Sequence, residues 1–178
     1  MMKNPVKILN KKFCATKNGI HYEQLTDLSN KYKIIRSTRY HNLIKFINHN
    51  KIYKFTKQSK LFKTMKYEMD TTIDKGHGCK NPDECFIDEK NNKIFIIEKK
   101  FQQTAGSTCE KIQTSNFKLW QYSRTFPNYE IVYIYCLSRW FKNNCKAELT
   151  YLEEKKVPVF YGCEEKYKEN IVEFIIEH

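Results

Sequence analysis

Glycine and proline are scarce in this chain, with five and four copies among 178 residues. It has no internal repeat, linker or low-complexity tract, so a repeat array or a string of loosely joined modules is not expected. No apolar run approaches the roughly 20 residues that cross a bilayer, and the N-terminus lacks the apolar core of a signal peptide. These absences predict a cytoplasmic protein with no membrane partner.

Standard cysteine motifs are also missing. The seven cysteines are odd in number, are scattered along the chain and include no Cys-x-x-Cys pair. This pattern argues against a disulfide framework and favours reduced thiols in a cytoplasmic protein. His77, Cys79 and Cys85 come nearest to a zinc site, but their spacing fits no standard zinc pattern.

Acidic residues are few in the first two-fifths of the chain. Residues 1–70 hold sixteen Lys or Arg against four acids, whereas residues 71–178 hold sixteen of each, so the net charge of +12 arises entirely in the first segment. Such asymmetry favours a polyanionic partner, and nucleic acid is the usual one. The alternative is that the lysines are ordinary solvated surface residues. This alternative explains less well why positive and negative charges balance in residues 71–178.

The first segment is expected to be mainly helical. Apolar spacing indicates helices over residues 21–30, 38–48 and 57–69, with Ser37 as an N-cap for the second. We therefore predict a basic, mainly helical N-terminal segment over residues 1–70 that serves as a DNA-binding lobe. A helix-turn-helix built from the first two helices is a less specific alternative, because the turn carries no distinctive residues.

Residues 71–178 begin with a predicted β-hairpin. Residues 94–97 are an apolar, β-branched run typical of a buried strand, and residues 85–87 form a shorter run before it. The polar stretch between them contains Asn91 and Asn92, which tolerate turn dihedrals. If the hairpin folds about this pair, the position opposite Asp83 is Lys100 or its neighbour.

An alternation of helices and strands follows the hairpin. Ser107 and Glu110 have the spacing of a capping box that opens a helix through about Tyr122. Residues 129–137 are the strongest strand, and Arg139 and Trp140 emerge at its carboxyl end. A helix between two strands predicts parallel pairing. Residues 146–154 and 164–177 indicate helices, and residues 157–161 a short strand. The sequence thus predicts an α/β domain with a mixed central sheet flanked by helices.

Two carboxylates and a lysine should meet at one end of this hairpin. Asp83 precedes the first strand, while Glu98 and Lys100 end the second and leave it on the same face. Magnesium is bound by one or two carboxylates with waters and phosphate, and a bound metal lowers the pKa of its water. Lys100 would orient or help deprotonate that water. Solvated charges at strand ends are the alternative in so charged a chain.

Pro82 and Asp83, followed by Glu98-Lys99-Lys100, resemble the signature of the PD-(D/E)XK nuclease superfamily, the fold of many type II restriction endonucleases. Residues 101–113 and 133–141 are also similar to restriction-enzyme members. The resemblance covers roughly residues 76–141. It implies a restriction-endonuclease-like core within a nuclease domain over residues 71–178.

The resemblance also implies roles for individual residues. Asp83 and Glu98 would bind Mg²⁺, for which Mn²⁺ could substitute, and Lys100 would be the catalytic lysine. Members of the superfamily often add an acid from a helix before the first core strand. Glu68 is the nearest candidate for that acid, with Glu23 behind it.

The expected function is magnesium-dependent hydrolysis of DNA phosphodiester bonds by a type II restriction endonuclease acting on double-stranded DNA. Two-fold symmetric sites are cut most simply by a C2 homodimer. Two alternatives stay open. One is a structure-selective nuclease of repair or recombination, similar to a Holliday-junction resolvase, since one fold hosts several functions. The other is a non-catalytic, basic nucleic-acid-binding protein.

Overall fold

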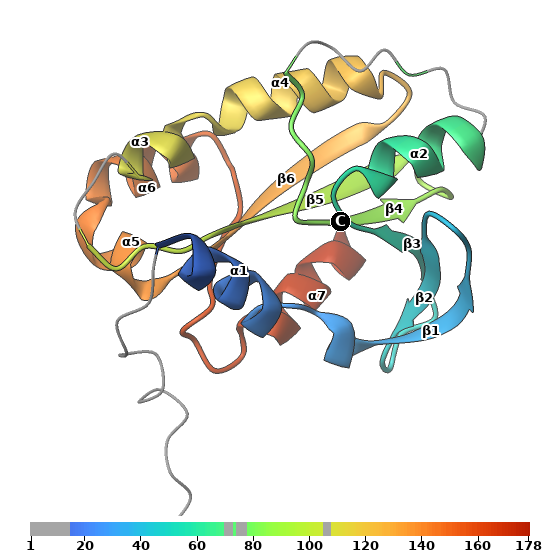
Figure 1. The fold of residues 1–178 in the computed structure, drawn as a ribbon, viewed down its shortest axis with the longest axis horizontal. Helices are drawn as coiled ribbons and strands as arrows, with labels where there is room; N and C mark the ends of the chain where they lie inside the picture. Colours follow the sequence, from blue (N-terminus) through green and yellow to red (C-terminus); the bar gives the residue numbers. More distant parts are fainter. Residues whose placement is uncertain (1–14, 70–72, 74–77, 105–107) are drawn as a thin grey trace, which may run out of the picture.

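One mixed seven-stranded sheet organises the part of the chain that the structure describes (Figure 1). The computed structural model describes residues 15–69, 73, 78–104 and 108–178. The strands are β1 (Tyr32–Ser37), β2 (Asn42–Phe46), β3 (Ile52–Thr56), β4 (Glu84–Asp88), β5 (Lys93–Lys100), β6 (Glu130–Leu137) and β7 (Val159–Tyr161). Their order in the sheet follows the chain. Strands β1 to β5 pair antiparallel, and β5 to β7 pair parallel.

Helices cover both faces of this sheet. They are α1 (Ala15–Leu25), α2 (Lys60–Tyr67), α3 (Thr108–Gln113), α4 (Ser115–Thr125), α5 (Arg139–Asn144), α6 (Lys146–Glu154) and α7 (Tyr167–Glu177), with a 3-10 turn at Ser29–Lys31. Figure 1 shows α2 and α4 above the sheet and α1 and α7 below it. The structure thus confirms an α/β fold with a mixed sheet flanked by helices. Among the described helices, none is long and apolar enough to cross a membrane.

Strand β5 lies at the centre of both cores. Ile94 and Ile96 join the core under α2, α4 and α6, whereas Phe95 and Ile97 join the core under α1 and α7. All four side chains are buried. A strand covered on both faces reads as a continuous apolar run, which is why this segment was recognisable in the sequence.

The predicted hairpin is confirmed, but its register differs. The side chain of Asp88 accepts hydrogen bonds from the backbone N–H and the amide of Asn91, and Asn92 takes a left-handed φ of 51°. Glu84 pairs with Ile97. Continuing the ladder by one pair places Asp83 opposite Glu98 rather than opposite Lys100.

The prediction of a mainly helical N-terminal segment is wrong. Residues 32–56 form three strands, and β2 occupies the predicted helix over residues 38–48, which also removes the helix-turn-helix. Ile44 and Phe46 are buried two residues apart on one face, so the two-residue period of a strand prevails over helical spacing. β3 pairs with β4, so the sheet runs across the predicted boundary at residue 70. Only the third predicted helix, which contains α2, lies where expected among residues 30–69.

The second segment follows the prediction closely. Helix α6 has the predicted bounds, and β6, β7 and α7 lie within theirs. The helix expected through Tyr122 is divided into α3 and α4 at Thr114, whose hydroxyl donates to the Lys111 carbonyl at 2.8 Å. Ser107 of the expected capping box lies outside the described residues. The parallel pairing of β5 with β6 is confirmed.

Candidate active site

Asp83, Glu98 and Lys100 meet at the end of the β4–β5 hairpin. The Asp83 carboxylate accepts a hydrogen bond of 2.7 Å from the backbone N–H of Lys99, which fixes it beside β5. Glu98 Oε1 accepts hydrogen bonds from Lys100 Nζ and, at 2.7 Å, from Lys118 Nζ on α4. The three residues lie together although the hairpin register differs from the predicted one. What the sequence did not indicate is the second ammonium group.

The two carboxyl groups differ in their electrostatics. Burial raises the pKa of Asp83 to about 6, the charge of Glu98 adds to this rise, and the Lys99 N–H and Lys100 oppose it. Burial also acts to raise the pKa of Glu98, but Lys100 and Lys118 outweigh it and hold that pKa below its ordinary value. Glu98 is therefore the fixed anion of the pair, and Asp83 changes charge near neutral pH.

Lys118 is a functional candidate that sequence analysis missed. Its ammonium group bridges Glu98 and the ring of Tyr133, which lies 5.9 Å from it. Tyr122, one helical turn further along α4, is buried and donates to the Lys80 carbonyl at 2.8 Å. No sequence spacing predicts that a lysine on a helix will contact a strand residue twenty positions earlier. The nearest signal in the sequence is the four-residue spacing of Lys118 and Tyr122, which places both on one face of α4.

The structure separates the two candidates for a third acid. Glu68 accepts hydrogen bonds from His41 Nδ1 and from Thr38 Oγ1, so it is engaged near the carboxyl end of α2. Glu23 instead lies close enough for its charge to raise the pKa of Asp83. Its backbone carbonyl also accepts a 3.0 Å hydrogen bond from Lys99 Nζ. Of the two acids, the structure places Glu23 nearer to the site.

Lys99 points to the opposite face of the sheet and has a different role. Its ammonium lies 3.2 Å from the carboxylate of Glu84, which also contacts Lys57 at 3.2 Å. Glu84 is 1% exposed, and burial raises its pKa although both lysines oppose the change. Lys57 continues the network to Asp27. The middle residue of Glu98-Lys99-Lys100 thus holds α1 and the sheet together.

Asp83 and Glu98 together fit a divalent cation. Two carboxylates on facing strands are enough for magnesium, which completes its shell with waters and substrate oxygens. The raised pKa of Asp83 reflects its burial and, added to that, the negative charge of Glu98 beside it. A cation bound between the two carboxylates would offset both the burial of Asp83 and the repulsion from Glu98. Among the described residues, these acids and Glu23 do not bring three ligand atoms within 4.8 Å of one another.

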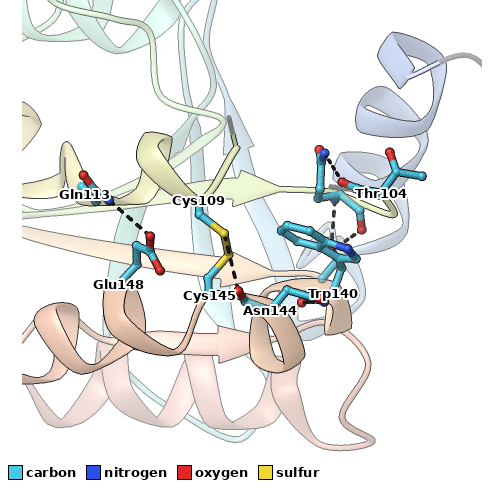
Figure 2. Close-up of a disulfide and its surroundings, with 9 residues drawn as sticks. Thr104, Cys109, Gln113, Trp140, Asn144, Cys145 and Glu148 are labelled. Atoms are coloured by element: carbon cyan, nitrogen blue, oxygen red, sulfur yellow. Dashed lines mark hydrogen bonds between the residues drawn. A yellow bond between two sulfur atoms is a disulfide. The ribbon is translucent and has the colours of Figure 1, made fainter. Parts of the chain in front are cut away.

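The expectation of seven reduced thiols is wrong for one pair. Cys109 at the start of α3 and Cys145 between α5 and α6 form a disulfide with Cα atoms 5.7 Å apart (Figure 2). The packing of α3 against α6 brings them together across 36 residues, which no local motif announces. Glu148 lies within 4.8 Å of both sulfurs, but bonded sulfurs are not thiolate ligands.

The combination of His77, Cys79 and Cys85, which the sequence did not favour as a zinc site, gains no support among the described residues. His77 lies outside the described residues. Cys79 and Cys85 are buried, and burial raises the pKa of the Cys85 thiol well above its usual range. Within the described chain, neither cysteine belongs to a group of three potential metal ligands. Cys136 is likewise a buried thiol, and Cys163 is half-buried.

Comparison with family models, curated proteins and solved structures finds no match. The resemblance to the PD-(D/E)XK superfamily thus stays a prediction from the motif. The functional argument depends on the geometry of the site.

Proposed function

We propose that the protein is a metal-dependent endonuclease that hydrolyses DNA phosphodiester bonds on a PD-(D/E)XK-type core. The observation that carries this proposal is the convergence of Asp83, Glu98 and Lys100 at one end of a buried hairpin. The order of elements agrees with it. A helix precedes antiparallel strands, the hairpin bears the acids, and a helical crossover leads to a parallel strand.

In this proposal Asp83 and Glu98 bind magnesium, with manganese as a substitute. The bound ion would supply positive charge beside the phosphate and make water easier to deprotonate. Asp83 must be ionised to bind it, so its pKa of about 6 permits loading at neutral pH.

The lysines act on the substrate side of the two acids. Lys100 is half-buried beside Glu98, where its ammonium can orient the attacking water or neutralise charge that builds on the phosphate. Lys118 reaches the same carboxylate from α4 and supplies a second positive charge. Because the Glu98 side chain is only 8% exposed, both interactions operate largely shielded from water.

Exposed basic residues in the first part of the chain support DNA as the substrate. Seven basic residues between β1 and α2 are exposed: Lys33, Arg36, Arg39, Lys51, Lys60, Lys63 and Lys66. Such side chains bind phosphates without reading sequence. Within this proposal, a type II restriction endonuclease acting on double-stranded DNA as a C2 homodimer is the more specific form.

A plasmid digest tests the proposal. Supercoiled DNA should be cut with Mg²⁺ and stay intact with EDTA, and discrete fragments would identify a site-specific enzyme. Asp83→Ala and Lys100→Ala should abolish cleavage and leave DNA binding largely intact. Lys90→Ala, in the exposed turn at the other end of the hairpin, is the matched control and should cut normally. Equal cleavage by wild type and Asp83→Ala would refute the proposal.

A further inference from the structure

A cavity of about 350 Å³ opens at the carboxyl ends of the three parallel strands. Its lining comes from the segment after β5, the segment after β6 with α5, the turn after β7, and α1. Phe101, the first lining residue after β5, directly follows Lys100. Along the chain, the lining of the cavity therefore begins one residue after Lys100.

Several contacts hold the walls of this cavity in place. The Ser138 hydroxyl donates to the Gln102 carbonyl and accepts from the Gln102 backbone N–H, both at 3.1 Å. The Ser138 N–H donates to the Lys100 carbonyl at 3.0 Å. Gly162 permits the close approach of Tyr22, because a Cβ atom added at Gly162 would lie 2.5 Å from the hydroxyl oxygen of Tyr22. The Ser138 contacts hold the segments that follow β5 and β6 against each other at the cavity.

The side chains of the lining suit a nucleobase. Trp140 and Phe101 are partly exposed aromatic rings, and the Phe101 ring lies 5.4 Å from that of Tyr22. Asn143 adds an exposed amide group, and Arg139 adds an exposed guanidinium. Gln102 adds an amide whose NH2 donates to the Thr104 carbonyl at 2.6 Å and whose oxygen can accept. Aromatic faces stack on bases, amides pair with base edges, and arginine contacts phosphate. Figure 2 shows the Trp140 indole beside Thr104 and Asn144, close to the disulfide.

We propose that this cavity receives one unpaired base of the DNA strand, next to the phosphodiester held at Asp83, Glu98 and Lys100. This proposal rests on the proposed function and deepens it. Bases in a duplex are stacked, so the base must be extruded or already single-stranded. The preferred substrate is then DNA with an unpaired nucleotide beside the cleaved bond.

Trp140 itself provides the test. The chain has two tryptophans, so Trp120→Phe leaves Trp140 as the only indole fluorophore. Its emission is titrated, in EDTA, with a single-stranded 12-mer, an abasic strand of equal length, the duplex and dAMP. We expect quenching by the single strand and at least fivefold weaker binding, without quenching, by the abasic strand. Equal affinity and quenching for the abasic strand would overturn the proposal. Equal affinity for dAMP and the 12-mer would overturn it in favour of a free-nucleotide site.

Matched substitutions separate stacking from folding. Trp140→Leu should weaken single-strand binding roughly five- to hundredfold, the range of one lost base stack, and leave abasic-strand binding unchanged. Trp120→Leu, at an exposed tryptophan on α4, should change neither affinity. Trp140→Phe keeps a stacking face and should retain most of the affinity. This variant provides the test if circular dichroism shows that Trp140→Leu is unfolded. An unchanged affinity in folded Trp140→Leu would overturn the proposal.

These measurements need neither metal nor cleavage. If the plasmid digest fails while base-dependent quenching persists, the nuclease proposal falls and the base site stands. If cleavage succeeds while binding ignores the base, only the base site falls.

Discussion

Lys118 Nζ lies 2.7 Å from Glu98 Oε1, so a helix that follows the hairpin places a second ammonium group on a carboxylate already paired with Lys100. Both lysines hold the pKa of Glu98 below its ordinary value against the effect of burial. The two lysines reach Glu98 in different ways. Lys100 lies on the same strand as Glu98, whereas Lys118 is brought to it by tertiary packing.

Replacing Lys118 by Met should slow cleavage and change its pH dependence. The variant loses one of the two charges that keep Glu98 ionised, so the pKa of Glu98 rises toward that of Asp83, and the acid limb of the rate profile, which Asp83 sets, becomes steeper. Loss of a positive charge near the phosphate should lower kcat roughly 10²-fold. The measurement is cleavage rate from pH 5 to 9 under saturating DNA. An unchanged acid limb, with Lys90→Met as control, would remove Lys118 from the site.

Asp83→Asn should stabilise the metal-free protein at high pH. The folded pKa of Asp83, about 6, lies above the ordinary value of 3.8, so the folded state holds the extra proton between these values. Stability therefore falls as pH rises through this window, and the loss is complete above pH 6. By this linkage the Asn variant should be more stable by roughly 3 kcal/mol at pH 8 and equal to wild type at pH 3. Urea unfolding in EDTA measures both. A difference that does not vary with pH would contradict the assigned pKa.

Local signals located most of the site. A β-branched run and a polar turn were enough to place Asp83 near Glu98 and Lys100. The predicted register was wrong because the turn spans residues 89–92. Its centre therefore lies between Lys90 and Asn91 rather than between Asn91 and Asn92. A shift of one in the turn centre moves the partner of Asp83 by two positions.

Long-range packing explains what the sequence did not reveal. Lys99 ties α1, the helix that carries Glu23, to the sheet, and Lys118 reaches Glu98 because α4 packs on β6. Strand β2 lies in a predicted helix because Leu43, Ile44 and Ile47 fit a helical face, and pairing with β1 and β3 selects the strand. The disulfide partners are far apart in the chain and carry no motif.

Reduction of the Cys109–Cys145 disulfide should destabilise the protein. It closes a loop across 36 residues, for which chain entropy gives roughly 4 kcal/mol. Guanidinium unfolding with and without a phosphine reductant measures the loss. The Cys109→Ser/Cys145→Ser double variant should show the reduced stability in both conditions, and Cys163→Ser should respond like wild type. Identical midpoints for wild type in both conditions would argue that the bond does not form in solution.

The two neighbouring lysines of β5 should fail in different ways when replaced. Lys99→Met leaves the buried carboxylate of Glu84 with Lys57 as its remaining cationic contact, so we expect a loss of stability of about 3 kcal/mol or more. Adding Glu84→Gln should recover much of that loss, because the uncompensated charge disappears. Lys100→Met removes a side chain that is 25% exposed, against 2% for Lys99, and Lys118 still pairs with Glu98, so the unfolding midpoint should fall much less while cleavage is abolished. Thermal unfolding and the plasmid digest, applied to all three variants, measure the two effects separately. If Lys100→Met were as destabilised as Lys99→Met, its loss of cleavage would be explained by misfolding, and Lys100 would no longer be assigned to catalysis.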